Sequence, residues 1–153
     1  MTTLQLKIPP PVYFLLFAGG MWLLAQHVPL LNLIPKPWNY SGILIAILTL
    51  LADLTSLWAF FKARTTVNPL RPQRTQHLVT SGLYRYTRNP MYLGLLVILL
   101  GWTIYLGALT PFLLLPAFVW VITRMQILPE EAMLQAKFGK TYSDYQQRVP
   151  RWL

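Results

Sequence analysis

The sequence predicts an all-α integral membrane protein, with about four transmembrane helices followed by short amphipathic helices on the cytoplasmic face. The 153-residue chain is 55% hydrophobic and only 11% charged, whereas soluble globular domains carry about 25% charged residues. Its apolar residues gather into four runs, each long enough to cross a hydrocarbon core of roughly 30 Å as a helix. Most of its basic residues lie outside these runs. A chain of this length suits a single domain, which we take as residues 1–153.

The four apolar runs define the expected helices. The first covers about residues 11–34 and becomes irregular toward its end, and the second covers 42–61 and contains one acid, Asp53. The third covers 91–109 without a charge, and the fourth follows it at 111–128 after a tight turn. No sequence pattern specifies an oligomeric state.

The distribution of charge predicts the orientation. Residues 62–90 contain six basic residues and no acid, whereas 35–40 contain only Lys36. Short basic loops stay on the cytoplasmic side, so we expect this loop and both termini in the cytoplasm, with a bacterial inner membrane as the location. This rule also explains the net charge of +9 without a nucleic-acid partner. The expected partner is the lipid bilayer.

The last segment, 129–153, has a different composition. Pro129 is suited to the first turn of a new helix, and Glu130 and Glu131 follow it near the positive end of that helix. Apolar residues then recur every three to four positions between charged ones, and Gly139 interrupts them. We therefore expect two short amphipathic helices that lie on the cytoplasmic membrane surface.

The composition excludes several kinds of site. The chain has no cysteine, which excludes disulfides, thiolate zinc sites and a cysteine nucleophile. It has two histidines, His27 and His77, so we predict no metal centre. A G-x-G-x-x-G fingerprint and a P-loop are also missing, so any nucleotide would be held in another way.

The stretch YRYTRNPMY, residues 84–92, places polar side chains at the start of the third apolar run. Tyrosine and arginine at this depth are common interfacial anchors, and Asn89 before Pro90 is suited to cap the helix. A polar site for a charged small molecule explains the same residues. Both interpretations stay open on physical grounds alone.

Two acidic features can likewise have either a structural role or a role in ligand binding. Glu130 and Glu131 can stabilise a helix start by about 0.3–1 kcal/mol each, or can accept hydrogen bonds from ribose hydroxyls or an ammonium group. Asp53 lies within a predicted span, where a carboxylate is costly and should face the bundle interior with a partner. It suits a structural hydrogen-bond network or a ligand contact. Four spans would bring 84–92 and 130–131 to one membrane face, where both can line one pocket.

The polar segments together are more specific than each alone. SGLYRYTRNPMYLG (81–94), a helical hairpin, and then EEAMLQAKFGKTYSDYQQRVP (130–150) occur in this order. This combination resembles the isoprenylcysteine carboxyl methyltransferase family, which is grouped with the phospholipid methyltransferases among small integral membrane enzymes that use S-adenosylmethionine. The resemblance covers about half of the chain. Asn89 stands where the eukaryotic pattern has histidine, so a titrating imidazole is missing at that position.

The resemblance implies a cofactor site at the cytoplasmic end of the hairpin, covered by the C-terminal helices. By position it implies cofactor-binding roles for Tyr84, Asn89, Pro90, Tyr92, Glu130 and Glu131, and catalytic roles for Arg88, Asn89 and Glu131. We further expect Asp53, Arg148 and Arg151 to contact the substrate, since arginine suits anionic groups.

Three functions follow in order of preference. The first is S-adenosylmethionine-dependent methylation of a lipophilic or small acceptor, as in isoprenylcysteine carboxyl methyltransferases. The second is phospholipid N-methylation, which needs a base to deprotonate the amine. The third is a non-catalytic membrane assembly or transport subunit, which would explain the hydrophobicity and Asp53 but not the joint occurrence of the two polar segments.

Overall fold

The computed structural model describes residues 6–62 and 78–153, with side chains described for 6–54 and 78–153. These residues are helical, and no β-strand occurs among them apart from one isolated bridge between Asn32 and Ala108. The prediction of an all-α protein is therefore confirmed for this part of the chain. The α-helices are α1 (Pro10–His27), α2 (Ser41–Lys62), α3 (Pro90–Leu106), α4 (Leu114–Ile122), α5 (Leu128–Phe138) and α6 (Lys140–Arg148).

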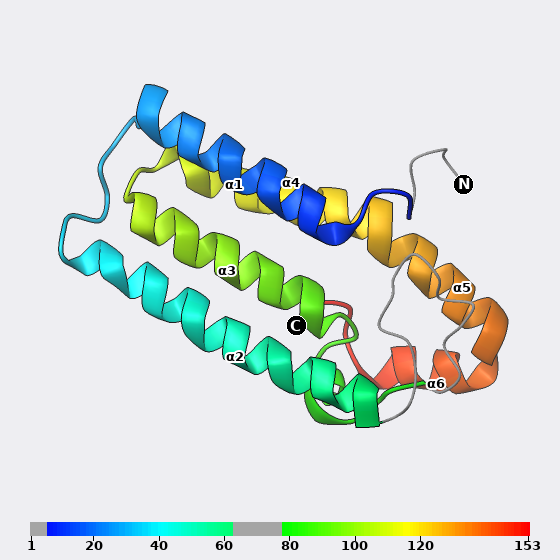
Figure 1. Ribbon diagram of the computed structural model, residues 1–153. Helices are drawn as coiled ribbons and strands as arrows, with labels where there is room; N and C mark the ends of the chain where they lie inside the picture. Colours follow the sequence, from blue (N-terminus) through cyan, green and yellow to red (C-terminus); the bar gives the residue numbers. More distant parts are fainter. Residues whose placement is uncertain (1–5, 63–77) are drawn as a thin grey trace.

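Helices α1 to α4 form a bundle in which α3 packs against the other three helices (Figure 1). Met21 of α1, Leu99 of α3, and Phe118 and Ile122 of α4 are fully buried in its core. α5 extends beyond the bundle, and α6 turns back below α5 toward the ends of α2 and α3 (Figure 1). The loops after α1 and α3 lie at the opposite end of the bundle.

Glycine brings α2 unusually close to α3. A Cβ atom on Gly42 would collide with the backbone of Gly101 and would lie 2.7 Å from the backbone nitrogen of Tyr105. A Cβ atom on Gly94 would collide with the carboxylate of Asp53. Small residues that permit backbone contact are typical of helix pairs in membranes, where a hydrophobic driving force between helices is missing.

Large apolar side chains also cover the outer surfaces of the bundle. On α1 and α2 the exposed residues include Leu15, Leu16, Leu44, Leu48 and Leu51. Patches of this kind mark a surface that is covered by another apolar phase or partner. Among the described residues, one helical run, Thr110–Phe138, is long and apolar enough to cross a membrane, while Trp38–Leu54 and Pro90–Leu106 are shorter apolar helices. The four predicted spans thus stay a prediction.

The first helix is shorter than the predicted 11–34. α1 ends at His27, because Pro29 has no N–H to continue the helical hydrogen bonds. The chain after it instead pairs with the turn that follows α3. Leu33 N–H donates to Gly107 O at 2.7 Å, and Leu109 N–H donates to Leu31 O at 2.9 Å. The third helix likewise ends early, at Leu106, where Gly107 adopts a left-handed conformation with a φ of 75°.

Pro129 lies in the first turn of α5, followed by Glu130 and Glu131, as predicted, but no break separates α5 from the helix before it. The chain is helical from Thr110 to Phe138, and a π-helical turn, Thr123–Ile127, joins α4 to α5. Proline removes the hydrogen bond to the carbonyl four residues earlier, here that of Met125. That carbonyl accepts a bond from Leu6 N–H at 3.2 Å instead. The π-turn and the N-terminal segment together compensate for Pro129 inside a continuous helix.

Gly139 separates α5 from α6 as predicted, with a φ of 50°. The apolar side of this helix pair is turned inward. Tyr142, Tyr145 and Val149 are buried, and Leu134 and Leu78 pack against them. The location of these helices on a membrane surface stays a prediction.

Candidate active site

Polar side chains from four segments meet at the end of the bundle where α3 begins. The turn before α3, the start of α5, helix α6 and the C-terminal residues all lie there (Figure 1). Two groups of contacts hold these segments together. One joins the C-terminal residues to the turn, and the other centres on the adjacent acids Glu130 and Glu131.

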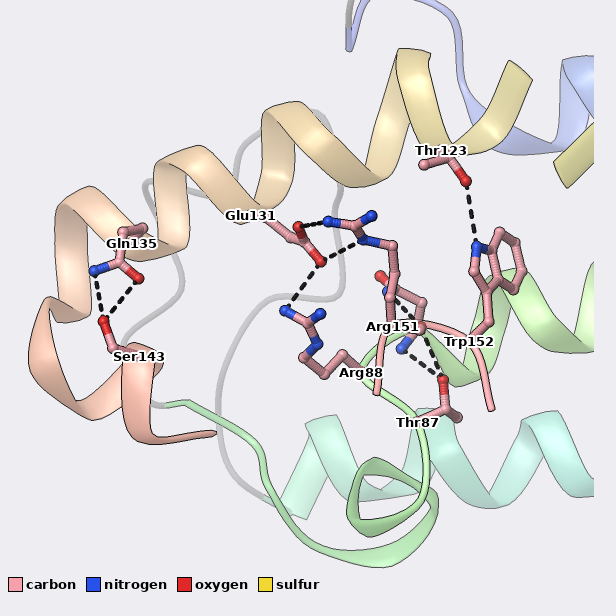
Figure 2. Close-up of polar contacts among 9 residues, drawn as sticks. Thr87, Arg88, Thr123, Glu131, Gln135, Ser143, Arg151 and Trp152 are labelled. Atoms are coloured by element: carbon pink, nitrogen blue, oxygen red, sulfur yellow. Dashed lines mark hydrogen bonds and ion pairs between the residues drawn. The ribbon is translucent and has the colours of Figure 1, made fainter. Parts of the chain in front are cut away.

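The C-terminal residues bind the turn before α3 mainly through their backbone carbonyls. Arg88 N–H donates to Pro150 O at 2.9 Å. Thr87 Oγ1 and Asn89 Nδ2 donate to Arg151 O at 3.2 and 2.9 Å (Figure 2). Asn89 occupies the N-cap position of α3 as predicted, but its side chain makes no capping bond. The asparagine amide is used to hold the C-terminal segment instead.

Glu131 lies between two arginines (Figure 2). Arg151 binds it side-on through one edge of its guanidinium group, with Nε to Oε1 at 3.0 Å and Nη2 to Oε2 at 2.7 Å. Arg88 Nη1 lies 3.1 Å from the same Oε1. The side chains of Arg88 and Glu131 are 11% and 10% exposed, while that of Arg151 is 37% exposed. Both carboxylate oxygens are therefore engaged, and the three residues carry one net positive charge.

Glu130 has a different environment from its neighbour. Tyr92 Oη, on the first turn of α3, donates a hydrogen bond to Glu130 Oε1 at 2.5 Å. Glu130 follows the predicted span 111–128. Burial, opposed in part by the Tyr92 hydrogen bond and reinforced by the charge of Glu131, raises the pKa of its carboxyl to about 8. A carboxyl with this pKa holds its proton at neutral pH.

Tyr84 and Asp53 border the Tyr92–Glu130 pair. Tyr145 Oη donates to Tyr84 O at 2.7 Å, which fixes the turn against α6. Burial raises the pKa of the Tyr84 phenol well above its usual value, and Tyr145, Glu130 and Asp53 raise it further. Asp53 reaches this group from α2, with its carboxylate packed against Gly94.

The predicted site residues thus fall into two sets. Nine of the ten lie in or beside these contacts, and Pro90 among them is buried at the first turn of α3. Arg148 lies apart: it is exposed on α6, and its Nε donates to Asp144 O of its own helix at 3.1 Å.

Sequence reasoning did not assign site roles to four residues that complete the cluster. Thr87 helps to hold the C-terminal segment, and Trp152 Nε1 donates to Thr123 Oγ1 on the π-turn at 3.2 Å (Figure 2). Tyr142 is almost fully buried beside this group, and Tyr145 binds the turn. Burial, reinforced by the charge of Glu131 and opposed by Arg88, raises the pKa of Tyr142 to about 12. The spacing Phe138-Gly139-x-x-Tyr142-x-x-Tyr145 was the available signal for the two tyrosines.

Comparison with known proteins identifies the family. A model of the phospholipid methyltransferase family matches residues 38–141, which is more than half of the chain. The chain belongs to this family. The resemblance deduced from its two polar segments is therefore confirmed at the family level, and the chain is a member of a family of methyltransferases.

Curated relatives agree with this assignment. An uncharacterised protein of Haemophilus influenzae is 49% identical over 63 residues, 41% of this chain and 100% of that protein. Protein-S-isoprenylcysteine O-methyltransferase of Schizosaccharomyces pombe is 38% identical over 73 residues, 48% of this chain and 31% of that enzyme. Protein-S-isoprenylcysteine O-methyltransferase B of Arabidopsis thaliana is 29% identical over 109 residues, 71% of this chain and 55% of that enzyme. The chain spans about a third to a half of these two methyltransferases. No solved structure gives a significant match.

Proposed function

We propose that this protein is an integral membrane methyltransferase that uses S-adenosylmethionine and methylates a lipophilic acceptor, as its named relatives methylate isoprenylcysteine. One observation carries this proposal. Residues 84–92, the pair Glu130-Glu131 and the C-terminal segment converge at one end of a bundle whose helices α1 and α2 expose large apolar side chains. A purely structural helix pair would not need three remote polar segments to meet at one place.

The residues at this end fit the chemistry of the cofactor. S-adenosylmethionine brings an already activated methyl group, so the protein has to align the reactants and exclude water. Among the residues that the structure describes, Arg88 Nε is buried without a hydrogen-bond partner, and it is a donor suited to a carboxylate. Glu130 is an acceptor for amino or hydroxyl groups, and Tyr92 orients it. The side chains of Tyr84 and Tyr142 add buried aromatic surface.

The apolar surfaces support a membrane-embedded enzyme. The exposed leucines of α1 and α2 suit contact with lipid chains, and the glycine contacts between α2 and α3 suit a membrane helix pair. We propose four spans, with the site at the cytoplasmic ends of α2 and α3. A lipophilic acceptor would then reach the site from the bilayer, with an anionic group held by Arg88 or Arg151.

Phospholipid N-methylation is the second candidate. The family description favours it, and Asp53 and Glu130 are candidate bases, since an amine must lose a proton before it attacks the methyl group. Glu130 can act as this base only after its own proton has left. A carboxylate or thiolate acceptor needs no such base. The acceptor class therefore decides between the two candidates.

The test is ligand binding followed by acceptor screening. Isothermal titration calorimetry on purified protein in detergent and in lipid nanodiscs should detect S-adenosylmethionine and S-adenosylhomocysteine. Glu131→Ala should weaken binding strongly, whereas Asp144→Asn, at an exposed acid on α6, should not. Radiolabelled methyl donor should then label an isoprenylcysteine analogue or an aminophospholipid. If neither ligand binds in any of these preparations, the non-catalytic alternative is favoured.

A further inference from the structure

The adjacent acids Glu130 and Glu131 differ in what they can still bind. Glu131 accepts guanidinium contacts at 2.7, 3.0 and 3.1 Å, which engage both of its oxygens. A new cationic ligand at Glu131 would have to displace an arginine. Glu131 is therefore suited to hold Arg88 and Arg151 in place.

Glu130 retains binding capacity. Its one hydrogen bond within residues 6–54 and 78–153 comes from Tyr92 Oη to Oε1. No ion pair reaches it within the same residues, because the contacts of Arg88 and Arg151 go to Glu131. A carboxyl group that is buried without a cation is costly when ionised, so it favours either a proton or a positively charged ligand.

Among the described residues, the groups that interact with Glu130 are acidic or neutral. Tyr92 faces it from α3 and Tyr84 from the turn before α3. Asp53 acts on the same phenol from α2, and Glu131 is its neighbour on α5. The positive charges of Arg88 and Arg151 are neutralised in part by Glu131. A cation placed here would be stabilised by Glu130 and Asp53 together.

From this arrangement we infer that Glu130, and not Glu131, receives a cationic group of the methyl donor, and that binding expels the proton which the Glu130 carboxyl carries in the free protein. The inference rests on the proposed function, because it assumes that S-adenosylmethionine binds at this end of the bundle. It adds a division of labour between two neighbouring acids and a proton that accompanies binding.

The proton balance is simple. In the free protein the pKa of Glu130 lies near 8, so at pH 6.5 this carboxyl is almost fully protonated. A bound cation favours the carboxylate, and the proton leaves to solvent. The amino group of the donor, with an ordinary pKa near 7.7–8.0, stays charged at pH 6.5 and does not supply the proton. Binding should therefore release close to one proton per molecule.

Calorimetry measures this proton directly. Titrations of S-adenosylmethionine at pH 6.5 in buffers of different ionisation enthalpy give the number of protons released, and the wild type should release close to one. Glu130→Gln keeps an acceptor for Tyr92 but has no proton to lose, so its release should fall to near zero and its affinity should fall as well. Asp144→Asn removes one of the other acids and should release as many protons as the wild type.

Two further arms sharpen the assignment. Tyr92→Phe removes the hydrogen bond that lowers the pKa of Glu130; affinity at pH 6.5 should fall while proton release persists. S-adenosylhomocysteine has the amino group and no sulfonium charge, so equal release with both ligands assigns the amino group, and release with the donor alone assigns the sulfonium.

The outcomes separate this inference from the proposed function. Binding by the wild type without proton release, or unchanged release in Glu130→Gln, overturns the inference and leaves the proposed function standing. Loss of proton release in Glu131→Gln with normal release in Glu130→Gln would reverse the two roles and also overturn it. If the wild type binds neither S-adenosylmethionine nor S-adenosylhomocysteine, both the inference and the proposed function are overturned.

Discussion

The two ends of the bundle are closed by different means. At the end that contains the turn after α3, hydrogen bonds to backbone groups make the closing contacts: Leu33 and Ile34 N–H both donate to Gly107 O, and Leu109 N–H donates to Leu31 O. At the other end, ion pairs among Glu131, Arg88 and Arg151 are added to such hydrogen bonds, with charges that are largely buried. Backbone pairing needs few particular side chains. Buried ion pairs are an expensive way to join segments, so their presence at one end points to a role beyond stability.

The largest effect is expected from Glu131→Gln. This change leaves Arg88 and Arg151 without the carboxylate that holds them, and the side chain of Arg88 is only 11% exposed. We expect the free energy of unfolding to fall by about 2 kcal/mol, less than for a fully buried pair because Arg151 is partly solvated. Methyl transfer should fall by roughly 100-fold, since displaced positioning groups cost about this much.

Thermal unfolding and a radiolabelled methyl-transfer assay on the same samples measure the two effects. If stability falls while activity per folded molecule is retained, the ion pairs at this end are only structural. Both ends of the bundle would then serve stability alone, one through backbone hydrogen bonds and the other through ion pairs.

The sequence predicted which residues form the polar end, but not the contacts that they make. The apolar runs predicted the helices, the basic loop predicted their orientation, and four spans predicted that 84–92 and 130–131 would meet. The end of α1, the π-turn and the tail contacts were not predictable in the same way. They depend on which distant backbone group makes the hydrogen bond that the helix can no longer make. The Gly107 carbonyl accepts from the segment after His27, and Leu6 N–H donates to the carbonyl that Pro129 leaves without a helical donor. Asn89 is a residue type that commonly caps helices, but its side-chain amide donates to the Arg151 carbonyl instead.

A smaller effect, of a different kind, is expected from Gly107→Ala at the backbone-paired end. Gly107 has a φ of 75°, and an added Cβ would lie 2.7 Å from Ile34 O. The left-handed conformation alone costs a residue other than glycine about 1–2 kcal/mol. The midpoint of thermal unfolding should therefore fall. Affinity for S-adenosylhomocysteine, measured by calorimetry below that midpoint, should stay at the wild-type value because the site lies at the opposite end. A large loss of affinity at full folding would mean that the two ends are coupled.

The smallest effect is expected from Arg148→Ala, which tests whether position in the fold or charge alone matters at the polar end. Arg148 and Arg151 are three residues apart and both are candidate substrate contacts, but Arg148 is exposed and bonds to Asp144 O of its own helix. Removal of such a surface side chain usually changes free energies by about 0.5 kcal/mol or less, so KM for the acceptor should change by less than about threefold. Arg151→Ala breaks the bidentate contact with Glu131 and should impair kcat and cofactor affinity together. A raised acceptor KM in Arg148→Ala, with cofactor affinity intact, would instead assign this exposed arginine to an anionic acceptor that approaches along α6. The substrate surface would then extend beyond the cluster around Glu131, and the ion pairs would mark the cofactor half of the site alone.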